Sequence, residues 1–128
     1  MMWLDRWSGP VTGAAIEVHR TLGPGLLESV YEVALCEELR SREIPFERQK
    51  GVPIRHRGLV LDPGLRLDLL IGDELVLELK SVDRINELHE AQLLTYLRLA
   101  HKRVGLLINF NVPVPRRGIR RFVNDAPD

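Results

Sequence analysis

Two short apolar runs carry ionisable side chains at positions that a β-sheet should bury. Asp68 interrupts the run at residues 65–71, and Glu78 and Lys80 interrupt the run at residues 75–81. A buried carboxylate or ammonium group is costly unless it is paired or binds a metal. These residue types at this spacing therefore predict a functional site in which two acids and a lysine meet.

The register of the hairpin decides whether these charges meet. With a two-residue loop at Gly72-Asp73, Asp68 would face Leu77, and Glu78 would point to the other side of the sheet. With a three-residue loop or a bulge, Asp68 lies opposite Glu78. One face of the hairpin then also collects six aliphatic residues, namely Leu67, Leu69, Ile71, Leu75, Leu77 and Leu79. Because burial of an apolar face fixes register, we predict an odd loop or a bulge.

Two carboxylates this close repel each other unless a cation lies between them. Oxygen ligands favour Mg²⁺ or Mn²⁺ over zinc, and the carbonyl of Leu79 is a candidate third ligand. Lys80 would then stabilise a developing oxyanion or hold the attacking water. The alternative is a buried Glu–Lys ion pair beside an aspartate at the sheet edge, because structural ion pairs produce the same pattern.

Three more polar side chains are candidates for the same site. Glu28 begins a predicted helix, where its carboxylate could complete a metal shell through water or could simply stabilise the helix dipole. Gln92 and Tyr96 are four residues apart on another predicted helix, so they project from one face toward Lys80. Their amide and phenol groups suit a phosphate or a bound water, and a half-buried polar rim is the alternative.

The elements that must position these residues indicate a mixed α/β domain. We expect helices at about 11–22, 26–42 and 86–100, with Asn86 as the N-cap of the third. Strands are expected at about 46–49, 52–56, 60–61, 65–71, 75–81 and 104–110, and residues 119–123 could form a final edge strand. The strand at 75–81, the third helix and the strand at 104–110 predict a parallel crossover unit.

Composition is typical of one globular domain, with 128 residues of which 45% are hydrophobic. We find no apolar run long enough to span a membrane and no signal-peptide pattern, so we expect a cytoplasmic protein. The net charge is zero, but residues 1–90 hold 16 acids and 11 bases, whereas residues 91–123 hold seven bases and no acid. This asymmetry predicts a basic edge beside the site that could follow phosphates, although a solvated surface without a partner has the same composition.

Several sequence blocks resemble the GxxExxY protein family. The run Gly25-Leu26-Leu27-Glu28-Ser29-Val30-Tyr31 matches the pattern that names this family. Residues 13–20, 89–96 and 107–111 resemble its other blocks in the same order, so the similarity covers about 12–124 of a single domain at 1–128. The family is placed in the PD-(D/E)XK nuclease superfamily. The resemblance therefore implies a four-stranded mixed sheet flanked by helices.

The resemblance also implies roles for individual residues. Asp68 stands for the aspartate of the superfamily motif, and Glu78 and Lys80 stand for its ExK. Glu28 is similar to the acid on the preceding helix, and Gln92 with Tyr96 resembles the QxxxY element of some members. The sequence departs from the motif at one position, where a leucine replaces the proline before the aspartate.

These observations predict a Mg²⁺- or Mn²⁺-dependent nuclease that hydrolyses phosphodiester bonds in nucleic acid, with DNA as the expected substrate. The expected metal ligands are Asp68, Glu78, Leu79 and Glu28, and the expected catalytic residues also include Lys80, Gln92 and Tyr96. One alternative is an inactive module of the same fold that binds nucleic acid or a protein partner. Another is a hydrolase of small phosphate esters. A domain of this size would capture its substrate alone, as a homodimer or through a partner.

Overall fold

The computed structural model describes residues 5–125, which form one mixed sheet between helices. The helices are α1 (Ser8–Leu22), α2 (Glu28–Ser41), α3 (Glu87–Leu99) and a short 3₁₀ helix, η1 (Pro115–Gly118). The strands are β1 (Phe46–His56), β2 (Leu59–Ile71), β3 (Leu75–Lys80), β4 (Val104–Asn109) and β5 (Ile119–Val123). Strand β3 is parallel to β4, and the other neighbours in the order β1-β2-β3-β4-β5 are antiparallel.

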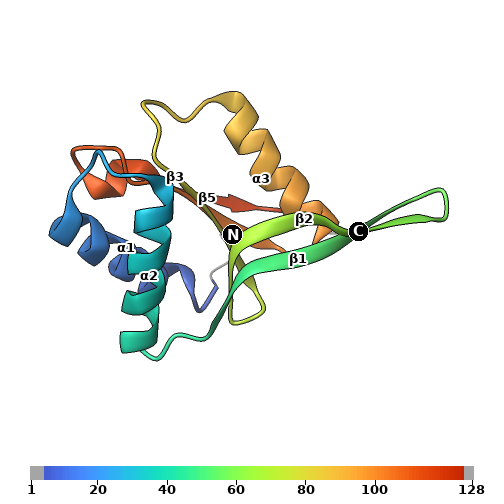
Figure 1. Cartoon of the computed structure of the whole chain (residues 1–128), viewed down its shortest axis with the longest axis horizontal. Coiled ribbons are helices and arrows are strands. Elements are labelled where there is room, and N and C mark those ends of the chain that lie inside the picture. The colour runs from blue at the N-terminus through green and yellow to red at the C-terminus, as the bar shows by residue number, and fades with distance from the viewer. Residues whose placement is uncertain (1–4, 126–128) are drawn as a thin grey trace.

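The sheet separates two hydrophobic cores, which gives the domain three layers (Figure 1). Helices α1 and α2 pack on one face, where Leu75, Leu77 and Leu79 of β3 are fully buried. Helix α3 packs on the other face through Leu93 and Leu97. The strict alternation of β3 between these cores is the pattern of a strand buried on both faces. None of the helices among residues 5–125 is both long and apolar enough to cross a membrane.

The sheet has five strands, so the expected number of four is wrong. Residues 119–123 add β5 to the free edge of β4, and the short strand pieces expected between residues 46 and 65 join into the long strands β1 and β2. Helix α1 begins at Ser8 rather than at Val11, which leaves Pro10 in the first turn, where proline is tolerated. The mixed α/β class and the order of helices and strands are as predicted.

The hairpin of β2 and β3 has the predicted odd register. Leu69 pairs with Leu77 and Ile71 pairs with Leu75, so the loop has three residues, Gly72 to Glu74. This register allows both strands to bury their aliphatic side chains against α1 and α2.

The prediction that Leu67 shares a face with Leu69 and Ile71 is wrong. It packs on the α3 side of the sheet, whereas Leu69 lies on the α1–α2 side with Ile71. The strand therefore changes face at Asp68. Across the ladder from Asp68, Gln49 of β1 has a left-handed backbone with φ of 52°. Further out, the ladder of β1 and β2 shifts its register between Val52 and Ile54, and the outer half of this hairpin leaves the body of the molecule (Figure 1).

Candidate active site

The carboxyl groups of Asp68 and Glu78 lie where β2 and β3 separate. The regular ladder between the strands ends at the pair of Leu69 and Leu77. One position further, the N–H of Leu79 donates a hydrogen bond of 2.8 Å to Asp68 Oδ2. The N–H of Asp68 is 3.4 Å from Glu78 Oε1. Backbone donors thus hold both carboxyl groups at the same gap in the sheet.

Burial makes both of these groups weaker acids. Glu78 is only 5% exposed, and its burial, together with the charge of Asp68, raises its pKa to about 8. Burial also raises the pKa of Asp68, and the hydrogen bond from Leu79 opposes this shift. A pair of adjacent buried carboxyl groups with raised pKa values is a frequent property of functional sites, although ion-pair networks also produce it.

The loop between α1 and α2 places Glu28 near this pair. Gly25 has φ of 96°, a conformation that favours glycine. The hydroxyl of Tyr31 donates to Gly23 O at 2.5 Å and accepts from the N–H of Leu26 at 3.1 Å. The Tyr31 ring stacks on Phe110, with 4.5 Å between the ring centroids. Tyr31 therefore fixes the loop that begins α2.

Glu28 lies in the first turn of α2 and lines a cavity of about 370 Å³ together with Asp68. The other lining residues are Leu27, Ser29, Glu32 and Gln49. Burial and the charge of Asp68 raise the pKa of Glu28. The helical acid therefore belongs to the same electrostatic cluster as the strand carboxyl groups.

Lys80 is joined to α3 by a chain of hydrogen bonds. Lys80 Nζ donates to Gln92 Oε1 at 3.4 Å, and Gln92 Nε2 donates to the Tyr96 hydroxyl at 3.1 Å. Burial and the charge of Glu78 raise the pKa of Tyr96, which keeps its phenol protonated. The start of α3 is fixed by Asn86, the predicted N-cap, whose side chain accepts from the N–H of His89.

Glu32 and Gln49 are two neighbours of the site to which the sequence prediction gave no role. Glu32 is 6% exposed, and Arg48 Nε donates to its Oε2 at 2.5 Å. Gln49 Nε2 donates to Glu32 Oε1 at 3.0 Å. Spacing could have identified Glu32, because it follows Glu28 by four residues on one helical face. No sequence signal marks Gln49, since glutamine has no preference for positive φ.

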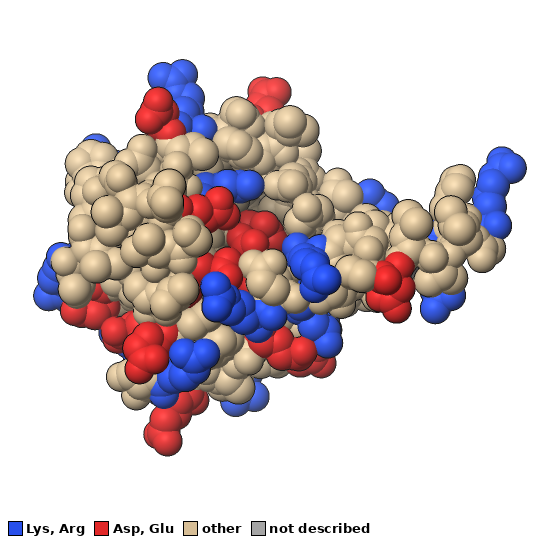
Figure 2. All heavy atoms as spheres, in the orientation of Figure 1, with Lys and Arg blue, Asp and Glu red and all other residues tan. Residues whose placement is uncertain are grey.

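The hollow around these residues is lined mainly by acidic side chains. Glu28, Glu32 and Asp68 line it, and the buried carboxyl group of Glu78 lies next to Asp68. Arg48 pairs with Glu32, and the charge of Lys80 acts on the other three acids. Figure 2 shows acidic side chains gathered in a depression, with basic side chains around it. A cation would reduce the repulsion between these acids.

The donor groups fit a magnesium ion, although they do not form a complete protein cage. Among residues 5–125, no three His, Cys, Asp or Glu side chains are placed to bind one metal ion. Mg²⁺ is usually held by one or two carboxylates and keeps several waters, so Asp68 and Glu78 suffice as side-chain ligands. The N–H of Leu79 points to Asp68, and the carbonyl of the same residue lies on that side of β3.

The basic residues of 91–123 do not form one edge beside the site, so this expectation is wrong. Lys102 pairs with Asp73 in the β2–β3 loop, at the end of β3 opposite Lys80. In β5, Arg120 pairs with Glu90 of α3, and Arg121 pairs with Asp5 near the start of α1. Acids that are distant in sequence therefore neutralise much of this charge.

Comparison with known proteins gives one match. A family model of the PD-(D/E)XK nuclease superfamily matches residues 5–122, which contain every side chain of the site described above. No curated protein and no solved structure matches the chain.

Proposed function

We propose that this chain, which belongs to the PD-(D/E)XK nuclease superfamily, is a Mg²⁺- or Mn²⁺-dependent nuclease that hydrolyses phosphodiester bonds in DNA. The supporting observation is the buried pair of Asp68 and Glu78 at the separation of β2 and β3, with Lys80 beside it. The loop geometry of Gly25, Glu28 and Tyr31 supports placement of the chain in the GxxExxY group.

Asp68, Glu78 and the carbonyl of Leu79 would hold the cation, and Glu28 would contribute through water. A divalent cation at such a site supplies Lewis acidity and lowers the pKa of water. The carboxyl groups must lose their protons before they can act as ligands. The raised pKa of Glu78 therefore makes ligand formation depend on pH.

Lys80 would contact the scissile phosphate or orient the attacking water with its ammonium group. Gln92 holds that group through its Oε1 and is itself held by the Tyr96 hydroxyl. We assign Gln92 a positioning role, because it acts on the substrate through Lys80. Tyr96 is protonated and can donate a hydrogen bond to a phosphate oxygen.

Cleavage of DNA by the purified protein, with and without Mg²⁺ or Mn²⁺, tests this proposal. We expect Asp68→Asn and Glu78→Gln to abolish metal-dependent cleavage, and Lys80→Met to slow it by ~10²-fold or more. Asn at position 68 keeps an oxygen for the N–H of Leu79, so the strand gap is preserved. Glu37→Gln, on the exposed side of α2, is the matched control. Cleavage at the wild-type rate by D68N and E78Q would refute the assigned roles.

A second candidate is a nuclease-fold module that binds nucleic acid or a protein partner without cleaving. It is favoured by the pKa of about 8 for Glu78, since a protonated carboxyl group binds cations poorly. Calorimetric titration with Mg²⁺ and Mn²⁺ at pH 6.5 and 8.5 separates the two candidates. Binding of DNA without metal binding at either pH would favour the inactive module.

A further inference from the structure

The outer half of the β1–β2 hairpin, residues 52–65, forms an arm that projects from the body (Figure 1). Arg57 and Gly58 at its tip both have positive φ, the geometry of a type I′ turn. Leu59, Val60 and Leu61 follow the turn and are 45–58% exposed. A two-stranded ribbon without a third layer is marginally stable alone. The exposed apolar residues therefore point to a binding partner for the arm.

Three arginines, two on the arm and one beside it, have no ion-pair partner within residues 5–125. Several basic side chains of the body are paired with an acid, as Arg48 is with Glu32. Within residues 5–125, Arg55, Arg57 and Arg98 lack such a pair. Asp62 is the only acid between residues 50 and 67 of the sequence. The net positive charge of the arm is complementary to a polyanion and disfavours its pairing with the arm of a second copy.

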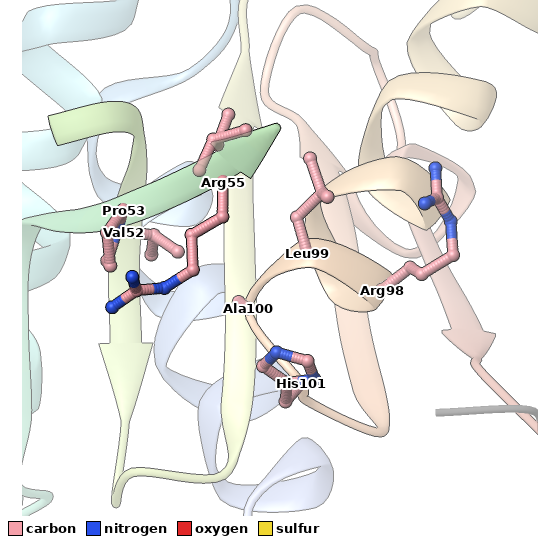
Figure 3. Close-up of a pocket in the computed structure, with 8 residues that line it drawn as sticks. Val52, Pro53, Arg55, Arg98, Leu99, Ala100 and His101 are labelled. Atoms are coloured by element: carbon pink, nitrogen blue, oxygen red, sulfur yellow. The ribbon is translucent and has the colours of Figure 1, made fainter. Parts of the chain in front are cut away.

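A groove of about 560 Å³ separates the arm from the C-terminal end of α3. Ile54 of the arm and Leu99 and Ala100 of the α3 end are among its lining residues. Arg55 and Arg98 lie on its two sides, and their guanidinium groups point away from each other (Figure 3). Cationic groups thus flank an apolar strip, which suits contact with bases or sugars between two lines of phosphates.

We propose that the arm binds duplex DNA and that Arg55 and Arg57 contact its phosphates. This inference rests on the proposed nuclease function and names the surface that would bind its duplex substrate. A two-stranded ribbon fits the major groove of B-form DNA, which is about 12 Å wide. The major groove of A-form RNA is too deep and narrow for side chains to read.

The arm could supply the affinity for DNA that the acidic hollow lacks. Free of metal, the carboxyl groups of the hollow repel phosphates, so affinity for DNA must come from another surface. The arm continues the two strands that carry Gln49 and Asp68. A long duplex held by the arm could extend along the ribbon toward the carboxyl pair.

Fluorescence anisotropy with a metal-free duplex of about 20 base pairs, between about 50 and 200 mM salt, tests the arm without requiring cleavage. We expect R55A/R57A to weaken DNA binding by about tenfold and to reduce the slope of log K against log salt by about two. The control R20A/R40A removes two exposed arginines from α1 and α2 and should bind like the wild type.

Equal DNA binding by R55A/R57A and the wild type would overturn the proposal, even if the protein cleaves DNA. The binding assay thus tests the arm, and the cleavage assay tests the active site. No binding by the wild type would overturn it too, as would equal losses on duplex DNA and on duplex RNA of the same sequence. The alternative is that the arm binds a second copy of the chain, which sedimentation of the wild type and of Val60→Asp tests. If the wild type is a dimer, and Val60→Asp is a monomer that binds DNA as well as the wild type, the arm belongs to the dimer interface. Circular dichroism confirms that each variant is folded.

Discussion

Burial and metal binding favour opposite protonation states of the Glu78 carboxyl group. Its burial beside Asp68 favours the neutral form, whereas a role as a metal ligand requires the charged form. The free protein therefore stores unfavourable electrostatic energy at this residue whenever the pH ionises it. Such opposition between stability and activity is common where a site must bind a charged ligand.

Replacement of Glu78 by glutamine should stabilise the metal-free protein at high pH. The pKa of Glu78 is about 8 in the folded state, against 4.5 for an unperturbed glutamate, so the native state holds a proton that the unfolded state loses between these values. The free energy of unfolding therefore falls as the pH rises from 4.5 to 8. We expect E78Q to exceed the wild type by on the order of 2–4 kcal/mol at pH 8 and to show little advantage at pH 4.5.

Urea unfolding at the two pH values measures this difference, with Glu37→Gln as the control because its carboxylate is exposed on α2. A stability difference between E78Q and the wild type that does not change with pH would contradict the raised pKa. Loss of cleavage in the same variant would separate the functional cost of the substitution from its structural benefit.

At the scale of elements, the sequence predicts those features that a local pattern determines. The register of the β2–β3 hairpin follows from the need to bury the aliphatic face that contains Leu69 and Leu77. The start of α3 follows from Asn86, whose side chain is a good N-cap. These two elements bring Lys80 to Gln92, which explains why spacing alone could suggest their proximity.

Long-range packing determines the features that the sequence did not predict. One such feature is the irregular backbone at Asp68, where Leu67 packs on α3 and Leu69 packs on the opposite core. It also requires a positive φ at Gln49, a residue type that does not favour one. Gln49 contacts Glu32 from this unusual backbone conformation, so helical spacing could suggest Glu32 but could not place its partner.

The loop before α2 allows a prediction at this scale. Tyr31→Phe removes the hydroxyl that bonds Gly23 O and the N–H of Leu26, but it keeps the stacking on Phe110. We expect this variant to lose about 1–2 kcal/mol of stability, the usual effect of leaving buried polar groups unpaired. The start of α2 should become less ordered, which would displace Glu28.

Thermal unfolding and metal titration of Y31F test this expectation. A role limited to packing would leave metal affinity unchanged, whereas displacement of Glu28 should weaken it. Full stability and full metal affinity in Y31F would show that the hydroxyl does not position the helix. The control is Ser29→Ala, which alters the same helical turn without touching the Tyr31 hydroxyl.

At the scale of the whole molecule, the net charge of zero conceals a separation of charge in space. Acids converge in the hollow around Asp68, while arginines such as Arg55 and Arg57 extend along the arm. The excess of bases at residues 91–123 led to a wrong prediction of a basic edge, because bases such as Lys102 pair with acids that are distant in the chain. The positively charged surface could therefore be located only from the three-dimensional structure and not from the sequence.

Metal binding should stabilise the whole domain, and the size of the effect should depend on pH. A ligand that binds only the native state adds about 2.7 kcal/mol at a concentration one hundred times its Kd, which should raise Tm by several degrees in a domain of this size. Because Glu78 must first lose a proton with a pKa of about 8, the increase in Tm with Mg²⁺ or Mn²⁺ should be larger at pH 8.5 than at pH 6.5. Asp68→Asn and Glu78→Gln should remove the increase, whereas Glu37→Gln should keep it. If neither metal changed the wild-type Tm at pH 8.5, a metal site between β2 and β3 would be contradicted. The carboxyl groups of Asp68 and Glu78 would then lie side by side without a cation between them.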